Sequence, residues 1–344
     1  MNYSITQYLL LGLLTFIFVG LITGPLRKLA LKVGAVDVPN LPRKIQTEPI
    51  PYLGGVAIAL GVVVATFAGI LVEDYSIVNF KIASTVIIPA LLIASVGLWD
   101  DIKELQPWPR LIAQTSVGTA MALILIATDT MGFALGNKFL NAAVSIFWIV
   151  GITNSINFFD NLDGGAAGTV AIASFFLFLI ANSEGQMLVS ALAIVVCGST
   201  AGFLLWNKSP AKIYMGDAGA LFLGIVMGVL TIRLDPGVKP QALSLVIPVA
   251  LLAVPILDTT VAVTSRIYRG ISPFTGGRDH LSHRLMRSGM HRKYAAITLW
   301  AASGVYGLLA YAIYQSQNSL YAFIAGAGWV ALLVFFLRIP SEDK

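Results

Sequence analysis

Acidic and amide side chains gather in three short motifs that lie far apart in this sequence. Asp100 and Asp101 lie in "GLWDDIKEL", and Asp217 lies in "IYMGDAGALFLG". The third motif, "TNSINFFDNLDGG", contains two amides and two acids, which are Asn154, Asn157, Asp160 and Asp163. Carboxylate and amide oxygens are the ligands that Mg²⁺ and Mn²⁺ prefer, whereas zinc favours Cys and His. The residue types therefore indicate a site for a hard cation, which usually binds together with phosphate.

The elements that hold these motifs are predicted membrane spans. Of the 344 residues, 57% are hydrophobic and only 11% are charged, and the mean hydropathy is +0.83, which excludes an ordinary soluble domain. Eleven apolar stretches approach the ~20 residues that cross a hydrocarbon core. They are 5–24, 53–72, 82–99, 111–128, 140–157, 165–182, 187–206, 214–232, 242–265, 295–314 and 320–337. We therefore predict an all-α polytopic membrane protein with one transmembrane domain over residues 1–344.

The basic residues predict the orientation of these spans. If alternate connections share a side, 18 of the 22 Lys and Arg residues fall on one side, and only Lys81, Lys138, Arg233 and Lys239 fall on the other. The positive-inside rule then places the N-terminus outside and the C-terminus in the cytoplasm of a plasma membrane protein. The same rule and anionic lipid headgroups explain the net charge of +5, and no basic patch interleaved with aromatic residues suggests nucleic acid.

In this topology, all three acidic motifs meet the cytoplasmic face. Taken singly, an acid at a helix end is often solvated, Asp217 can cap a helix, and an Asn can bond a neighbouring helix. Five carboxylates on one face repel one another unless a cation or a substrate neutralises them, which favours a functional site. Asn157, Asp160 and Asp163 recur at helical spacing, so they would share a side as long as the helix continues. Nearby glycines would allow the backbone to approach a ligand closely.

The last cytoplasmic loop, 266–294, contains the donors that such a site needs. Arg278, His280 and His283 suit a diphosphate or sugar hydroxyls, and the two histidines would share a helical side. The histidine pair also allows a metal site, although no third soft ligand lies nearby. Asp258 is the acid that lies clearly inside a span, so it is either a functional residue or a buried side chain that orients a neighbour.

Six stretches, taken in order, resemble the polyprenyl-phosphate N-acetylhexosamine-1-phosphate transferases. They are "RKIQTEPIPYLGG", "GLWDD", "TNSINFFDNLDGG", "IYMGDAGALFLG", "PILDTTVAV" and "RDHLSHRL". The resemblance covers nearly the whole chain. It implies transfer of a sugar 1-phosphate from a UDP-sugar to a lipid-carrier phosphate, release of UMP, and a requirement for Mg²⁺. The family includes enzymes that initiate teichoic acid and O-antigen synthesis, as well as the muramoyl-pentapeptide transferase.

Roles for individual residues follow from the resemblance. It implies that Asp217 and Asn157 hold Mg²⁺ and that Asp100 or Asp101 serves the attacking lipid phosphate, with Asp160 as a third candidate catalytic acid. Asp163 would recognise the uracil base, and Tyr214 would stack on it. The remaining candidate substrate-binding residues are Asn154, Arg43, Lys44, Arg278, His280 and His283.

The sequence departs from the family pattern in three places, and alternatives stay open. Asp160 precedes Asn161, Ala218 and Ala220 stand in the "DGS" region, and Ser282 replaces one histidine of "HLHH". We expect UDP-N-acetylglucosamine as the donor, with the muramoyl-pentapeptide transferase as the alternative within the family. An ion-coupled transporter is the alternative from another class, but it would carry its acids near the membrane midplane. The sequence also leaves open whether the protein forms a homodimer.

Overall fold

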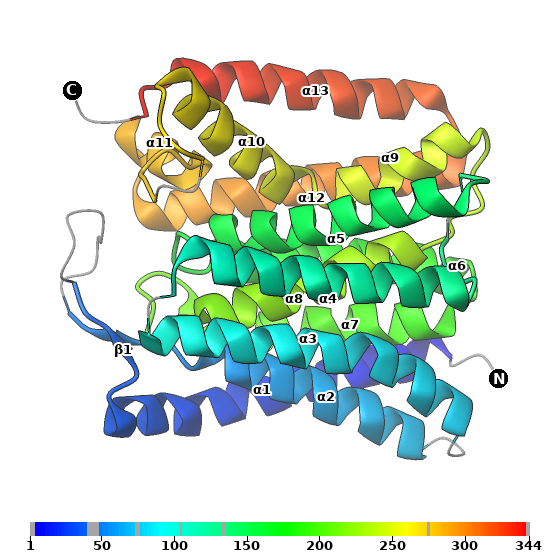
Figure 1. Cartoon of the computed structure of the whole chain (residues 1–344), viewed down its shortest axis with the longest axis horizontal. Helices are drawn as coiled ribbons and strands as arrows, with labels where there is room; N and C mark the ends of the chain where they lie inside the picture. Colours follow the sequence, from blue (N-terminus) through cyan, green and yellow to red (C-terminus); the bar gives the residue numbers. More distant parts are fainter. Residues whose placement is uncertain are drawn as a thin grey trace.

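The chain is described by a computed structural model that covers residues 4–39, 48–72, 76–103, 105–132, 135–273 and 276–341. The predicted contacts of Arg43 and Lys44 lie outside these residues. Within them the structure contains thirteen α-helices and one two-stranded sheet (Figure 1). In chain order the elements are α1 (Ile5–Val33), β1 (Val36–Asp37), β2 (Ile50–Pro51), α2 (Gly54–Val72), α3 (Ile77–Lys103), α4 (Pro107–Ala127), α5 (Lys138–Phe159), α6 (Gly165–Ser183), α7 (Met187–Asn207), α8 (Gly216–Arg233), α9 (Gln241–Leu251), α10 (Ala253–Tyr268), α11 (Leu281–Arg287), α12 (Arg292–Ser316) and α13 (Ser319–Arg338).

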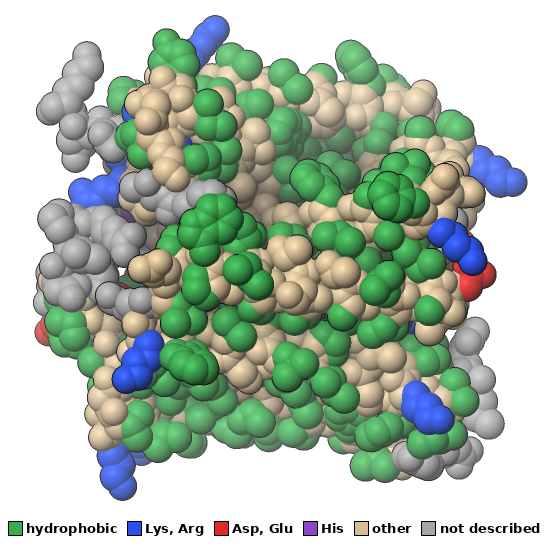
Figure 2. All heavy atoms as spheres, viewed as in Figure 1, with side chains coloured by type: hydrophobic (Ala, Val, Ile, Leu, Met, Phe, Trp, Pro, Cys, Tyr) green, Lys and Arg blue, Asp and Glu red, His purple; other side chains and the backbone are tan. Residues whose placement is uncertain are grey.

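The helices confirm the predicted all-α polytopic architecture. Ten helices in the described ranges are long and apolar enough to cross a membrane, and α9 with α10 makes an eleventh if the pair is one broken span. Figure 2 shows hydrophobic side chains across the middle of one face and Lys and Arg side chains gathered toward its two ends. This is the pattern of a bundle whose middle faces hydrocarbon and whose ends face polar surroundings.

The predicted span 242–265 is not one straight helix. The structure divides it at Leu252 into α9 and α10, which are bent by 75° relative to each other. Pro255 has no backbone N–H to donate to the carbonyl of Leu251, and its ring crowds that carbonyl. The helix breaks one turn before this proline, a position that apolar composition alone does not reveal.

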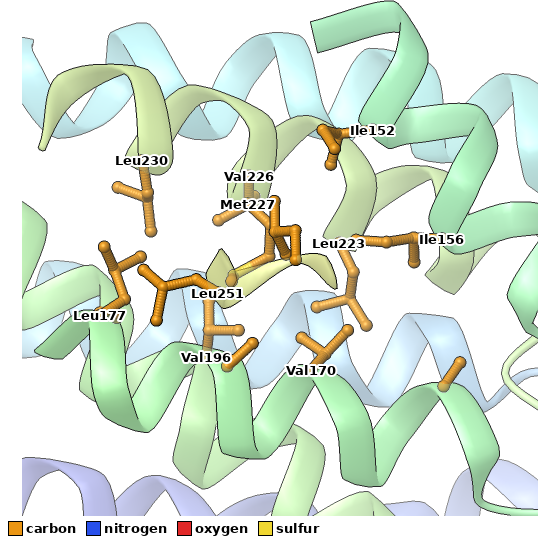
Figure 3. Close-up of a cluster of buried hydrophobic side chains, with 14 of the residues drawn as sticks. Ile152, Ile156, Val170, Leu177, Val196, Leu223, Val226, Met227, Leu230 and Leu251 are labelled. Carbon is orange, nitrogen blue, oxygen red and sulfur yellow. The ribbon is translucent and has the colours of Figure 1, made fainter. Parts of the chain in front are cut away.

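Helix α8 lies at the centre of the bundle. In its apolar window 83% of the residues are buried, against 11% in α13. It packs on α2, α3 and α5. Figure 3 shows how its apolar side chains meet residues of four other helices, and the labelled residues are Ile152, Ile156, Val170, Leu177, Val196, Leu223, Val226, Met227, Leu230 and Leu251. Because α8 is enclosed on all sides, its N-terminus is a fixed point around which a site can be built.

The small sheet ties the start of α2 to the segment that leads into α8. Val36 of β1 pairs with Pro51 of β2 in an antiparallel register. The N–H of Tyr214 donates to the carbonyl oxygen of Pro51 at 2.8 Å, and the N–H of Gly54 donates to the carbonyl oxygen of Tyr214 at 3.0 Å. In Figure 1, β1 and α11 lie at the end of the bundle that holds the C-terminus, and the N-terminus lies at the other end.

Helices α3 and α8 approach each other closely at Gly97. A Cβ atom at this position would lie 2.6 Å from the backbone carbonyl carbon and oxygen of Asp217 and 2.7 Å from the backbone nitrogen of Ala218. Backbone atoms cannot move aside as a flexible side chain can. The glycine therefore sets the distance between the acidic end of α3 and the start of α8.

We predict that Gly97→Ala destabilises the protein by about 1–3 kcal/mol, because the added methyl group overpacks the contact between α3 and α8. The apparent melting midpoint of the purified protein in detergent measures this effect. Gly151→Ala is the matched control, since a Cβ at Gly151 meets nothing within 4 Å. Equal midpoints for the two variants would show that the helices do not approach so closely.

Candidate active site

The first turn of α8 is held by an acid from another helix. Asp101, near the end of α3, accepts hydrogen bonds from the backbone N–H groups of Asp217 at 2.8 Å and of Ala218 at 3.2 Å. These N–H groups have no partner within their own helix, and the positive end of the helix dipole favours a carboxylate there. Gly216 has a φ of +69°, and a Cβ on it would lie 2.5 Å from Asp101 Oδ2. The turn therefore requires glycine at this position.

The two predicted metal ligands lie in contact. Asn157 in the last turns of α5 donates from Nδ2 to Asp217 Oδ1 at 2.6 Å. One turn earlier, Asn154 donates from Nδ2 to Oε1 of the buried Gln114 at 2.6 Å and to the carbonyl oxygen of Val150 at 2.8 Å. Asn154 therefore bonds α4 and its own helix, and its role toward a substrate stays a prediction.

Arg110 in the first turns of α4 is a site residue that the sequence interpretation did not single out. Its Nη1 atom lies 2.7 Å from Asp100 Oδ2 and 2.8 Å from Asp217 Oδ2. The other oxygen of Asp100 accepts a hydrogen bond from the N–H of Leu105 at 2.6 Å. A cation thus lies between two of the predicted acids. The only signal in the sequence was a basic residue ten positions after Asp100, and such a residue is equally explained by the positive-inside rule.

The spacing of Asn157, Asp160 and Asp163 suggested one shared helical side, but the helix ends before the two acids. Helix α5 ends at Phe159, so Asp160 caps it and Asp163 lies in the turn that follows. Gly164 then adopts a φ of +71° as the N-cap of α6, which is a conformation that favours glycine. Burial and the charges of Asp217 and Asp163 raise the pKa of the Asp160 carboxyl to about 8. Asp160 is therefore harder to ionise than an exposed aspartate.

Asp163 and Tyr214, the predicted uracil-binding pair, lie on neighbouring segments. A carboxylate oxygen of Asp163 accepts a hydrogen bond from the N–H of Ala211 at 3.2 Å, in the connection between α7 and α8. Burial and the charge of Asp163 raise the pKa of the Tyr214 hydroxyl. The two side chains are close enough to interact, and their contact with a nucleotide stays a prediction.

Asp258 fixes the position of His280. The fully buried Asp258 accepts hydrogen bonds from Nδ1 of His280 at 2.7 Å and from the N–H of Leu281 at 2.7 Å. The other ring nitrogen, Nε2, lies 3.3 Å from a guanidinium nitrogen of Arg266. Since Arg266 can only donate, Nε2 accepts and the ring proton lies on Nδ1. Of the two explanations for Asp258, the structure favours the buried residue that orients a neighbour.

The loop around His280 is held by a buried ion pair. Arg266 binds both oxygens of Asp279 at 2.8 Å, and Arg269 adds a contact at 2.9 Å. Burial opposes ionisation of Asp279, but the hydrogen bonds and charge of Arg266 prevail and lower its pKa. Such bidentate pairs fix geometry as well as charge.

The two histidines do not share a helical side, because α11 begins at Leu281 and His280 is its N-cap. The two rings still lie close, with centroids 6.2 Å apart. Burial is the main cause that lowers the pKa of His283 to about 4, so its imidazole is neutral near pH 7. The hydroxyl of Ser282, which stands in the family's histidine position, bonds Oδ1 of Asn161. The loop is thereby joined to the turn after α5.

The donor set fits a magnesium ion that shares its coordination with phosphate. Mg²⁺ usually takes one or two carboxylates and completes its shell with water and substrate oxygens. The Asp217 carboxylate and the Asn157 amide oxygen are hard ligands, and the amide nitrogen of Asn157 already holds the two side chains together. Among the residues that the structure describes, no three His, Cys, Asp or Glu side chains form a metal cage by themselves.

We predict that Asp258→Asn loosens the 276–287 segment. The Asp258 carboxylate has two accepting oxygens, whereas an asparagine amide has one oxygen and one NH2 group, which donates. Either Nδ1 of His280 or the N–H of Leu281 therefore loses its buried acceptor, at a cost of about 1–3 kcal/mol. Trypsin cleavage after Arg278 and Arg287 in the folded protein should become faster by tenfold or more. The exposed Asp235→Asn, from the connection between α8 and α9, is the control. Equal cleavage rates for both variants would contradict the orienting role.

Comparison with known proteins agrees with the arrangement of the motifs. A family model described as "Glycosyl transferase family 4" matches residues 83–235. The chain is 34% identical to the "Probable undecaprenyl-phosphate N-acetylglucosaminyl 1-phosphate transferase" of Bacillus subtilis over 329 residues, which is 94% of this chain and 88% of that protein. It is 30% identical to the "Decaprenyl-phosphate N-acetylglucosaminephosphotransferase" of Mycobacterium tuberculosis over 364 residues, 96% of this chain and 89% of that protein.

A more distant relative gives the same result. The "Undecaprenyl-phosphate alpha-N-acetylglucosaminyl 1-phosphate transferase" of Escherichia coli is 26% identical over 332 residues, 94% of this chain and 86% of that protein. The similarity extends through all the motifs and through the helices that hold them. The resemblance seen in the motifs is thereby confirmed, and the chain belongs to glycosyl transferase family 4, the family of these polyprenyl-phosphate transferases.

Proposed function

We propose that this membrane protein transfers N-acetylglucosamine 1-phosphate from UDP-N-acetylglucosamine to a polyprenyl phosphate such as undecaprenyl phosphate, and releases UMP. The observation that carries the proposal is the meeting of Asp101, Asn157 and Asp217 at the N-terminus of α8. These residues come from three motifs of the family. The relatives that match nearly the whole chain are named for this transfer.

The reaction moves one phosphorus atom between two oxygens. An oxygen of the lipid phosphate forms a bond to the phosphorus that carries the sugar. The bond from that phosphorus to the bridging oxygen breaks, and the bridging oxygen leaves with UMP. The product is a polyprenyl diphosphate that carries N-acetylglucosamine, and no proton needs to be moved when the lipid phosphate is fully ionised. Positioning and charge neutralisation are therefore what the protein must supply.

The site has groups suited to each part of this reaction. Asp217 and Asn157 would hold Mg²⁺, or Mn²⁺ in its place, against the diphosphate, and the bound ion would neutralise the charge that develops on phosphate oxygens. Both oxygens of Asp100 and both oxygens of Asp101 already accept hydrogen bonds or an ion pair. This supports direct attack by the lipid phosphate over a covalent aspartyl intermediate. Asp100 and Asp101 would then act by positioning on the lipid side.

The nucleotide and the sugar would lie on either side of the acids. Asp163 and Tyr214 would bind the uracil, as proposed from the family motifs. On the other side, His283 has a neutral ring next to Arg278, whereas both ring nitrogens of His280 are engaged by Asp258 and Arg266. This supports His283 and Arg278 as contacts of the sugar phosphate and His280 as the residue that positions them.

The proposed orientation follows from the basic residues. The N-terminus would lie outside and the C-terminus in the cytoplasm of the bacterial plasma membrane, with the acidic end of the bundle at the cytoplasmic face. A UDP-sugar is a charged cytoplasmic metabolite, so this orientation would give the donor access. The product would begin the synthesis of a cell-envelope glycopolymer such as teichoic acid or lipopolysaccharide.

We predict that the purified chain releases UMP from UDP-N-acetylglucosamine only when polyprenyl phosphate and Mg²⁺ are present. The assay compares a panel of UDP-sugars, with UMP and the lipid product measured by mass spectrometry. Faster UMP release from UDP-muramoyl-pentapeptide would instead favour the alternative function, that of a muramoyl-pentapeptide transferase. Absence of release from every UDP-sugar would contradict the proposed function.

We predict that Asp217→Asn lowers the transfer rate by a factor of at least 100 and removes the Mg²⁺ dependence of nucleotide binding, because the metal loses its carboxylate. Steady-state UMP release and calorimetric UMP binding at several Mg²⁺ concentrations measure the two effects. Asp129→Asn is the matched control, since Asp129 is exposed beyond the other end of α4 and its φ of 50° suits Asn. A transfer rate near that of the unchanged protein would remove Asp217 from the metal site.

A further inference from the structure

Arg110 is a cation held by the acidic cluster. A single nitrogen, Nη1, lies within 2.8 Å of carboxylate oxygens from both Asp100 and Asp217. The bridge joins the end of α3 to the start of α8 through the first turns of α4. Within the part of the chain that the structure describes, the exposed Lys103 of α3 forms no such bridge.

The backbone holds Arg110 in place for this bridge. Asp100 accepts a hydrogen bond from the N–H of Leu105, two residues before α4 begins. Gln106 is extended, with φ of −65° and ψ of 153°, and Pro107 begins α4. Proline is favoured at a helix start, where its fixed φ preorganises the turn. The guanidinium is thus directed back toward the end of α3 by a stiff turn.

The two carboxylates that Arg110 bridges differ in their access to solvent. The side chain of Asp100 is 7% exposed, whereas that of Asp217 is 28% exposed. Asp100 also has a second partner in the backbone, so its contact with Arg110 is the more permanent one. Asp217 is the carboxylate that a ligand from outside can reach.

A metal ion at Asp217 would have to share the carboxylate with two partners that already bind it. Asp217 Oδ1 already accepts from Asn157 and Oδ2 from Arg110. Each carboxylate oxygen has two lone-pair sites, so an ion bound at Oδ2 would share this oxygen with a guanidinium nitrogen that already lies 2.8 Å away. Two cations at one carboxylate also repel each other. The contact of Arg110 with Asp217 therefore opposes binding of the ion, and binding of the ion weakens that contact.

We propose that Arg110 is a positioning residue that competes with the divalent cation for Asp217. Without the cation, Arg110 neutralises Asp100 and Asp217 and keeps α3, α4 and α8 together. When the cation binds, Arg110 leaves Asp217 and stays on Asp100. This inference rests on the proposed function, because it takes Asp217 to be the metal ligand.

The competition lowers the apparent affinity for the cation. Only the fraction of molecules in which Asp217 is free can bind, so removal of the competitor raises the affinity. The same removal leaves carboxylates of like charge facing each other without a cation, which destabilises the metal-free state. An arginine with a merely structural role would give the second effect without the first.

The test measures Mn²⁺ binding to the full-length protein in detergent, with no nucleotide or lipid, by the loss of the free-ion electron paramagnetic resonance signal. Arg110→Gln should bind Mn²⁺ about tenfold more tightly than the unchanged protein, which corresponds to about 1.4 kcal/mol. Arg110→Lys keeps the charge but not the planar fork and should give a smaller increase. Melting midpoints should be lower for Arg110→Gln in EDTA, and the deficit should shrink at saturating Mg²⁺.

Lys103→Gln is the matched control, because it removes an equal charge from the same end of the bundle without removing a bridge. It should change Mn²⁺ affinity by less than about twofold, since an exposed charge is screened. Unchanged or weaker Mn²⁺ binding by folded Arg110→Gln and Arg110→Lys would overturn the competition. An equal increase in the Mn²⁺ affinity of Lys103→Gln would also overturn the competition, because it would show that the effect comes from net charge alone.

The two proposals can fail separately. Transfer activity together with unchanged Mn²⁺ affinity in Arg110→Gln overturns the competition and leaves the proposed function standing. Tighter Mn²⁺ binding that Asp217→Asn abolishes, without transfer from any UDP-sugar, supports the competition and contradicts the proposed function.

Discussion

Repulsion among carboxylates at the N-terminus of α8 is the constraint on which the arrangement of this site depends. Asp100 and Asp101 at the end of α3 meet Asp217 at the start of α8, and like charges that converge in this way oppose folding unless donors or cations offset them. The first N–H groups of α8 bind Asp101, and Arg110 bridges the other pair. Each offset comes from a different element. The cluster therefore forms only when α3, α4 and α8 meet in the correct register.

The membrane-spanning bundle makes that register rigid. Helix α8 is enclosed by apolar side chains along most of its length (Figure 3), and Gly97 brings its first turn against α3. In hydrocarbon, backbone groups must be satisfied within the protein, so a site with open backbone and charged groups belongs at the end of the spans. The ion pair of Arg266 with Asp279 and the bonds of Asp258 to the histidine segment hold the second wall of the site in the same way. The acids and the histidine loop are both held before any substrate arrives.

Much of this architecture follows from sequence because its signals are strong. Apolar stretches of spanning length predict the helices, three acidic motifs at one predicted face predict that these motifs gather, and the family resemblance implies that Asn157 and Asp217 meet. The sequence does not reveal the bend between α9 and α10, because a proline such as Pro255 is found in transmembrane helices that continue as well as in helices that break. Arg110 was not recognised because a lone basic residue after a span equally fits a topology charge. His280 was expected to contact the sugar, but the buried partners of its ring nitrogens become visible only in three dimensions.

The central claim is that the acids at α8 assemble a site where a divalent cation and a nucleotide sugar bind together. The most direct test is the affinity of the full-length protein for UDP-N-acetylglucosamine, measured calorimetrically as a function of Mg²⁺ concentration. Linkage predicts that the logarithm of the affinity rises with the logarithm of the Mg²⁺ concentration, with a slope that approaches one ion per nucleotide below saturation. An affinity that does not change with Mg²⁺, in protein that is folded and binds the donor, would contradict the account.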